Sequence, residues 1–132
     1  MRTLNRPIFP KFAALLLIFL LMAGPLVPAD PAGGTTDLSE TIQYLLDFVK
    51  NSGCRFYRND KAHNAAEAAA HMQRKYEHFK DEIKTPEDFI RLTATRSLLT
   101  GKLYYVELGD GKNITSETWL RQALENYRQK QN

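Results

Sequence analysis

The residues with the clearest chemical potential lie on one predicted helix that begins after Asn64. At about 100° per residue, its polar side chains share an arc opposite an apolar stripe. These polar residues are Glu67, His71, Arg74, Lys75 and His78. His71 and Lys75 are nearest the apolar edge, so they could frame the rim of a pocket. The alternative is a solvated face with weak i,i+4 contacts, such as Glu67 to His71.

Three histidines suggest zinc, but their spacing argues against it. His71 and His78 are two helical turns apart, about 10.5 Å along the axis, so they cannot bind one ion. Glu67 and His71 have a workable spacing, yet a third ligand, His63 or Cys54, would have to come from a separate segment. We therefore expect no metal site and no cofactor.

Ser97 could act as a nucleophile if His71 served as its base. No acid that would orient His71 is identifiable, and the chain has neither a Gly-x-Ser-x-Gly elbow nor a Ser-x-x-Lys pair. Hydroxyls at a helix end, as around Ser97, are usually capping groups. A small hydrolase or transferase is therefore an alternative to a binding protein.

The first 29 residues have the pattern of a cleavable signal peptide. Arg2, Arg6 and Lys11 precede an apolar run, residues 12–23, and Val-Pro-Ala at 27–29 fits cleavage after the alanine. The run is shorter than the roughly 20 apolar residues of a transmembrane helix. We expect an exported protein with no stable membrane span after cleavage.

Charge and cysteine content exclude two further classes. The 132 residues include 18 Lys and Arg against 15 Asp and Glu, a net charge of +3. The excess comes from the first 29 residues, so the remaining chain is neutral and lacks the clustered cations of nucleic-acid binding. The single cysteine, Cys54, excludes an intramolecular disulfide. We expect a buried thiol, with an intermolecular bridge or a redox thiol as the alternative.

The elements that position these residues follow from periodicity and caps. Residues 30–36 are predicted to be a flexible tether, and residues 37–132 a single domain. Helices are expected over 38–50, 64–81, 85–95 and 115–127, with residues 128–132 fraying. A hairpin is expected over 54–63, turning at Asn59-Asp60, and strands at 103–108 and 113–114. This order predicts an α+β fold, with about four amphipathic helices packed on a small antiparallel sheet.

Several of these residues also form a recognisable pattern. The first half contains Phe56-Tyr57-Arg58-Asn59, His63, Glu67-Ala68, His71-Met72 and Lys75-Tyr76. The second half contains Thr85-x-Glu87-Asp88-Phe89-Ile90, Ala94-Thr95-x-Ser97, Thr100-Gly101-Lys102-x-Tyr104 and Trp119-Leu120. In this pattern the chain resembles an uncharacterised family of small exported bacterial proteins, domain of unknown function 5329. It departs from the family at Asp60, where glycine is frequent, and at Leu103, where proline is common. The resemblance implies a periplasmic location and a shared fold, and it carries no activity.

The leading interpretation is a non-enzymatic periplasmic module that binds a small anionic ligand or a protein partner. Its candidate ligand-binding residues are Arg58, Asn59, His71, Lys75, Ser97 and Lys102. The alternatives are the hydrolase or transferase that uses Ser97 and His71, and a structural envelope protein with a surface aromatic patch. A pocket that joins the 64–81 helix to the turn after Ser97 favours the first two classes, and a flat apolar patch favours the third.

Overall fold

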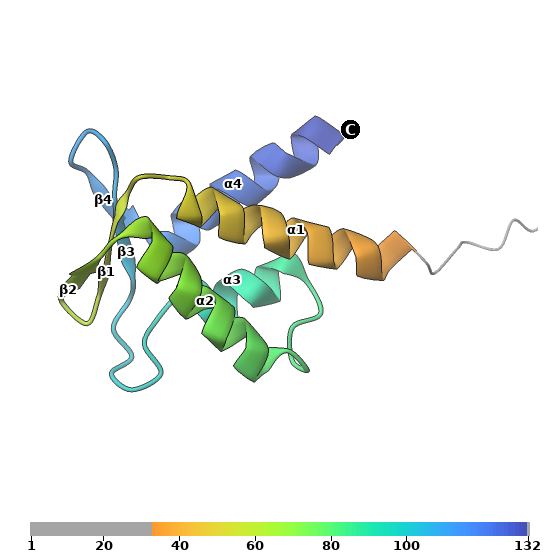
Figure 1. Cartoon of the computed structure of the whole chain (residues 1–132), viewed down its shortest axis with the longest axis horizontal. Helices are drawn as coiled ribbons and strands as arrows, with labels where there is room; N and C mark the ends of the chain where they lie inside the picture. Colours follow the sequence, from red (N-terminus) through yellow and green to blue (C-terminus); the bar gives the residue numbers. More distant parts are fainter. Residues whose placement is uncertain (1–32, 132) are drawn as a thin grey trace, which may run out of the picture.

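The computed structural model describes residues 33–131, so the predicted signal peptide lies outside the described residues. Four helices and four strands follow one another along this part of the chain (Figure 1). They are α1 (Gly33–Lys50), β1 (Arg55–Arg58), β2 (Lys61–His63), α2 (Ala65–Phe79), α3 (Pro86–Ala94), β3 (Tyr105–Glu107), β4 (Asn113–Thr115) and α4 (Ser116–Gln131). The strands form one antiparallel sheet in the order β2-β1-β3-β4. The predicted α+β class is confirmed.

Local sequence signals explain where the elements begin and turn. Asn59 and Asp60 both adopt positive φ, at 50° and 65°, as a two-residue hairpin between β1 and β2 requires. Asn64 closes a reciprocal capping box with Glu67 at the start of α2. The Thr85 side chain caps α3 ahead of a proline in its first turn. Each of these signals was readable in the sequence.

The sheet has one face toward the helices and one toward solvent. Phe56 and Val106 are buried on the inner face, in register with His63 and Ile114. Because residues two apart on a strand share a face, β1 also directs Arg58 inward. On the outer face the Tyr57 hydroxyl donates to Glu107 Oε2 at 2.6 Å.

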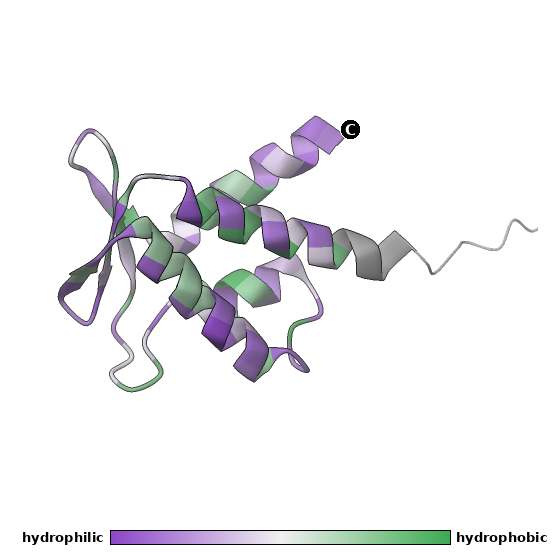
Figure 2. Cartoon of the chain, in the orientation of Figure 1, coloured by the Kyte–Doolittle hydropathy of each residue, from purple (hydrophilic) through white to green (hydrophobic). Residues whose placement is uncertain are grey.

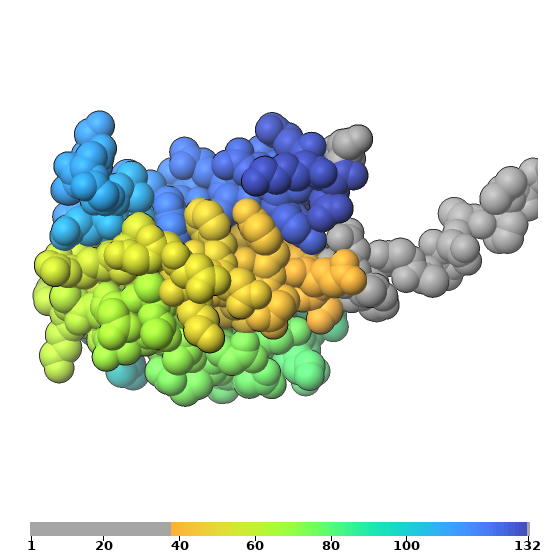
Figure 3. All heavy atoms as spheres, turned by 45° about the horizontal axis from the view of Figure 1, so that its top comes forward, coloured from red at the N-terminus to blue at the C-terminus, as the bar shows by residue number. Residues whose placement is uncertain are grey.

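The core lies between the inner face of the sheet and the helices. Its most completely buried large side chains come from α1, α3, α4 and β3, and they are Leu45, Val49, Phe89, Ile90, Val106 and Leu120. The loop between α3 and β3 instead projects past the sheet, and Figure 2 shows apolar residues at its projecting end. Figure 3 shows α1 lying between α2 and α4 on the face that is turned forward. Among residues 33–131, no helix is both long and apolar enough to span a membrane.

Four details differ from the sequence expectations. α1 begins at Gly33 and takes in residues 33–36 of the expected tether, because residues added to a formed helix gain backbone hydrogen bonds without a new nucleation step. α4 continues through Gln131 instead of fraying after residue 127, with Thr115 as its cap. β3 is shorter than expected, because Leu103 forms an isolated bridge with Arg96 and the Tyr104 amide donates to the Thr95 carbonyl. Both residues thus pair with the segment that follows α3. Cys54 is half-buried against the core, where a buried thiol was expected.

Candidate functional site

Five of the six predicted site residues line one open pocket between β1, α2 and the turn after Ser97. Its volume is about 340 Å³. The lining consists of Arg58, Asn59, His71, Lys75, Ser97, Leu98, Leu99 and Tyr104, and none of these residues has a carboxylate. We call this space the outer pocket. The site therefore combines two permanent or near-permanent cations with neutral hydrogen-bonding groups.

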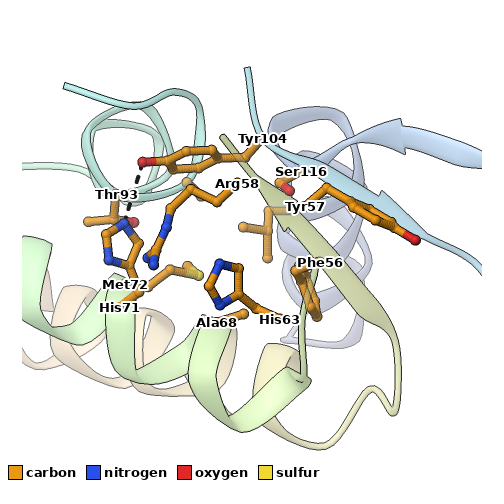
Figure 4. A pocket seen from close by; sticks show the side chains of 12 residues that line it. Phe56, Tyr57, Arg58, His63, Ala68, His71, Met72, Thr93, Tyr104 and Ser116 are labelled. Carbon is orange, nitrogen blue, oxygen red and sulfur yellow. Dashed lines mark hydrogen bonds between the residues drawn. The ribbon is translucent and has the colours of Figure 1, made fainter. Parts of the chain in front are cut away.

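A smaller cavity of about 40 Å³ adjoins the outer pocket beneath the sheet, and we call it the inner cavity. Arg58, His71 and Tyr104 line both spaces. Figure 4 shows Arg58 reaching from β1 toward α2, with the His71 and His63 rings on either side of it. Within residues 33–131 Arg58 has no carboxylate partner within ion-pair distance. Its guanidinium is thus available to a ligand from either space.

Lys75 is the most deeply placed cation of the outer pocket, with only 7% of its surface exposed. Its ammonium donates to the Arg96 carbonyl at 3.0 Å and lies 5.2 Å from the centre of the Tyr104 ring. Burial, together with the nearby Arg58 charge, lowers the pKa of Lys75 from 10.5 to about 8. Lys75 therefore stays largely protonated at neutral pH, at a cost to the folded state.

His71 is half-buried on the same face of α2, one turn before Lys75. Its Nε2 lies 3.4 Å from the Tyr104 hydroxyl, with the two rings edge to face. Burial, then the charges of Arg58 and Lys75, lower the pKa of His71 from 6.5 to about 4. The ring is neutral at pH 7, so it offers a hydrogen bond and no charge.

Ser97 and Asn59 connect the β1–β2 hairpin to the turn after α3. The Ser97 hydroxyl accepts from the amides of Leu99 and Thr100 at 3.3 and 3.4 Å, and from Asn59 Nδ2 at 3.3 Å. Asn59 Oδ1 accepts from the Thr100 hydroxyl at 2.6 Å. Both residues thus fix the wall of the outer pocket as well as lining it.

The alternative dyad is not assembled in this arrangement. Ser97 and His71 line the same pocket, but within the described residues His71 hydrogen-bonds to Tyr104, and Ser97 accepts from turn donors. Burial raises the pKa of the Tyr104 hydroxyl. Tyr104, not Ser97, is therefore the hydroxyl that His71 contacts.

Lys102 is the one predicted site residue outside the outer pocket. Its ammonium pairs with Asp60 on the neighbouring hairpin, and both side chains are largely exposed. Lys102 was grouped with the other candidates because it is a polar residue within the pattern that resembles the family. The turn reverses the chain after Ser97, so Lys102 comes out beside the hairpin instead.

The zinc alternative depended on Glu67 and His71 facing the same space. Glu67 contacts His63 at 3.5 Å and completes the α2 capping box, so it does not face His71. No group of three His, Cys, Asp or Glu side chains among residues 33–131 could hold a metal ion.

Sequence reasoning gave too little weight to three residues. Tyr104 contacts both His71 and Lys75, but a tyrosine in so small a domain is usually part of the core. His63 Nε2 and Ser116 Oγ are buried without a hydrogen-bond partner in the described structure, and both residues line the inner cavity. The alternation of β1 and β3 was the available signal for Tyr104, because it places residues 56, 58, 104 and 106 on one face.

The amino-acid sequence matches a known protein family. The profile of a family of unknown function, DUF5329, matches residues 36–128. The chain belongs to this family. It is also 43% identical over 49 residues to the uncharacterised protein YfeK of Salmonella typhimurium, a match that covers 37% of this chain and 41% of YfeK. The chain thus matches less than half of the length of that relative. No solved structure matches it.

Proposed function

We propose that this protein is an exported module that binds a small anionic ligand in the outer pocket, without catalysing a reaction on it. The observation that carries the proposal is the convergence of Arg58 and Lys75 on one open space whose lining includes no carboxylate. A bound carboxylate or phosphate would accept from the Arg58 guanidinium, for which charge-assisted and bidentate bonds are the strongest available.

The neutral groups around these cations suit the same ligand. Asn59 and Tyr104 offer hydrogen bonds at the pocket wall, and His71 adds a neutral ring. Export follows from the predicted signal peptide and is part of the proposal. His71 Nε2 contacts the Tyr104 hydroxyl and not Ser97, which favours a binding role over the Ser97–His71 dyad.

The test is calorimetric titration with inorganic phosphate and with acetate, in a buffer low in chloride, using protein purified from a host that expresses the full chain. We expect Arg58→Gln to weaken binding by about tenfold or more, the usual effect of losing a charged hydrogen bond. Arg55→Gln is the matched control, because Arg55 lies on the same strand but is exposed on the opposite face. Equal losses of affinity in the two variants would mean that net charge alone, and not the position of Arg58, determines binding.

The pH dependence provides a second readout. Lys75 loses its proton above about pH 8, so anion affinity should fall between pH 7 and pH 9.5 in the wild type. The fall should be absent in Lys75→Met, whose affinity is lower throughout. An affinity that does not change over this range would contradict the role of Lys75.

A further inference from the structure

The outer pocket has an apolar wall that the anion-binding proposal does not use. Leu98 and Leu99 line it, yet 65% and 94% of their surfaces are exposed. They are the two most exposed large hydrophobic residues of the described structure, and they are adjacent in sequence. Single exposed leucines are ordinary, but a neighbouring pair on the rim of a pocket requires an explanation.

The fold holds this pair in place with a defined turn. The Ser97 hydroxyl accepts from the amides of Leu99 and Thr100, and the Gly101 amide donates to the Ser97 carbonyl at 2.9 Å. Gly101 has a φ of 71°, a conformation that glycine adopts without strain. Asn59 fastens the turn to the hairpin through two further hydrogen bonds. The exposure of the two leucines is thus built into the structure.

The apolar rim and the cations therefore border the same space. Leu98 and Leu99 lie on the α3–β3 loop, whose apolar end projects from the body of the domain in Figure 2. Arg58 and Lys75 come from β1 and α2, and the Lys75 ammonium is held by the carbonyl of Arg96, just before the turn. If the anionic group of a ligand binds to these cations, the rest of the ligand would lie over the two leucines.

We infer that the ligand is an anionic amphiphile, with a carboxylate or phosphate head on Arg58 and Lys75 and an apolar chain against Leu98 and Leu99. This inference rests on the proposed anion-binding function and adds the ligand class. The apolar chain of the ligand would be recognised by the area that it buries. The affinity should therefore depend strongly on the length of this apolar chain and only weakly on its detailed shape.

The test compares acetate, butanoate, hexanoate and octanoate by calorimetry at one pH and ionic strength. A fully buried methylene tightens binding by about fourfold, and octanoate has six more methylenes than acetate. Octanoate should therefore bind at least tenfold more tightly than acetate, even if only about two of the six are buried. In the double variant Leu98→Ser/Leu99→Ser the ratio of octanoate to acetate affinity should collapse toward one. Leu103→Ser is the control, because Leu103 is also partly exposed but lines a different pocket, and its ratio should match that of the wild type.

The possible failures are distinguishable. If acetate and octanoate bind equally, the amphiphile is wrong and the anion site stands. If the double variant keeps the wild-type ratio of octanoate to acetate affinity, the apolar chain of the ligand does not lie against Leu98 and Leu99, and the inference is overturned. If neither carboxylates nor phosphate bind, the proposed function itself fails. The protein could also co-sediment with phosphatidylglycerol vesicles while its affinity for soluble carboxylates shows no dependence on chain length. That result would assign the two leucines to a membrane surface and also overturn the inference.

Discussion

Replacing Lys75 by methionine should make the domain's stability respond differently to pH. A pKa of about 8 in the folded state against 10.5 when unfolded corresponds to at most about 3.4 kcal/mol. The outer pocket is open to solvent, which screens the charge, so we expect about 1–2 kcal/mol. Methionine removes this penalty but also loses the hydrogen bond to the Arg96 carbonyl, worth about 1 kcal/mol. At pH 7 the variant should therefore be as stable as the wild type or slightly more stable.

The pH window follows from the proton balance of Lys75. Between pH 8 and 10.5 the unfolded chain holds a proton on Lys75 that the folded chain has released. The free energy of unfolding of the wild type therefore rises with pH in this window, and below pH 8 the full penalty remains. In Lys75→Met this contribution is absent, so the stability advantage of the variant should shrink by about 1–2 kcal/mol from pH 8 to pH 10.5.

Urea unfolding followed by the fluorescence of the single tryptophan, Trp119, would measure this difference. Trp119 packs against Phe48, with ring centroids 4.6 Å apart, so its emission should report loss of the core. Lys61→Met serves as control, because Lys61 is exposed and its variant should follow the wild-type curve. Parallel curves for Lys75→Met and the wild type from pH 8 to 10.5 would refute the idea that Lys75 is desolvated.

Two further predictions concern other parts of the chain. Fractionation of a bacterial host that expresses the full chain should recover a periplasmic protein starting near Asp30; an uncut protein in the membrane pellet would favour an anchor instead. Cys54→Ala should leave the protein monomeric and cost about 1 kcal/mol or less in stability, because the thiol is only half-buried; a disulfide-linked dimer of the wild type on a non-reducing gel would contradict this.

The elements were predictable wherever one residue type has a strong local preference. Asn59 and Asp60 could be assigned to a hairpin because few other residues tolerate two successive positive φ angles. Asn64 and Glu67 marked the start of α2 by their spacing alone. The length of β3 was not predictable, because it depends on Leu103 pairing with Arg96, a contact between segments that no local pattern encodes.

The site was predictable to the extent that helix periodicity determines which face of the helix a side chain lies on. His71 and Lys75 were placed at the apolar edge of α2 from their spacing, and the structure brings both to one pocket. Lys102 lies outside this pocket, paired with Asp60, because the chain reverses after Ser97, and its residue type alone does not indicate such a reversal. That turn depends on the Asn59 side chain, which lies on a different hairpin. Tertiary hydrogen bonds of this kind are invisible to a pattern search.

The electrostatics of the free site give a reason for a ligand to bind. Burial lowers the pKa of both His71 and Lys75; beyond burial, Arg58 and Lys75 lower the pKa of His71 further, and Arg58 lowers that of Lys75. Each cation thus raises the free energy of charging its neighbours, and none of the outer-pocket residues has a carboxylate to offset this. An anion in the pocket would reverse the sign of the local field and return both pKa values toward their ordinary range. The negative charge of the ligand would then offset the repulsion among the cations of the empty site, and this gain would add to the affinity.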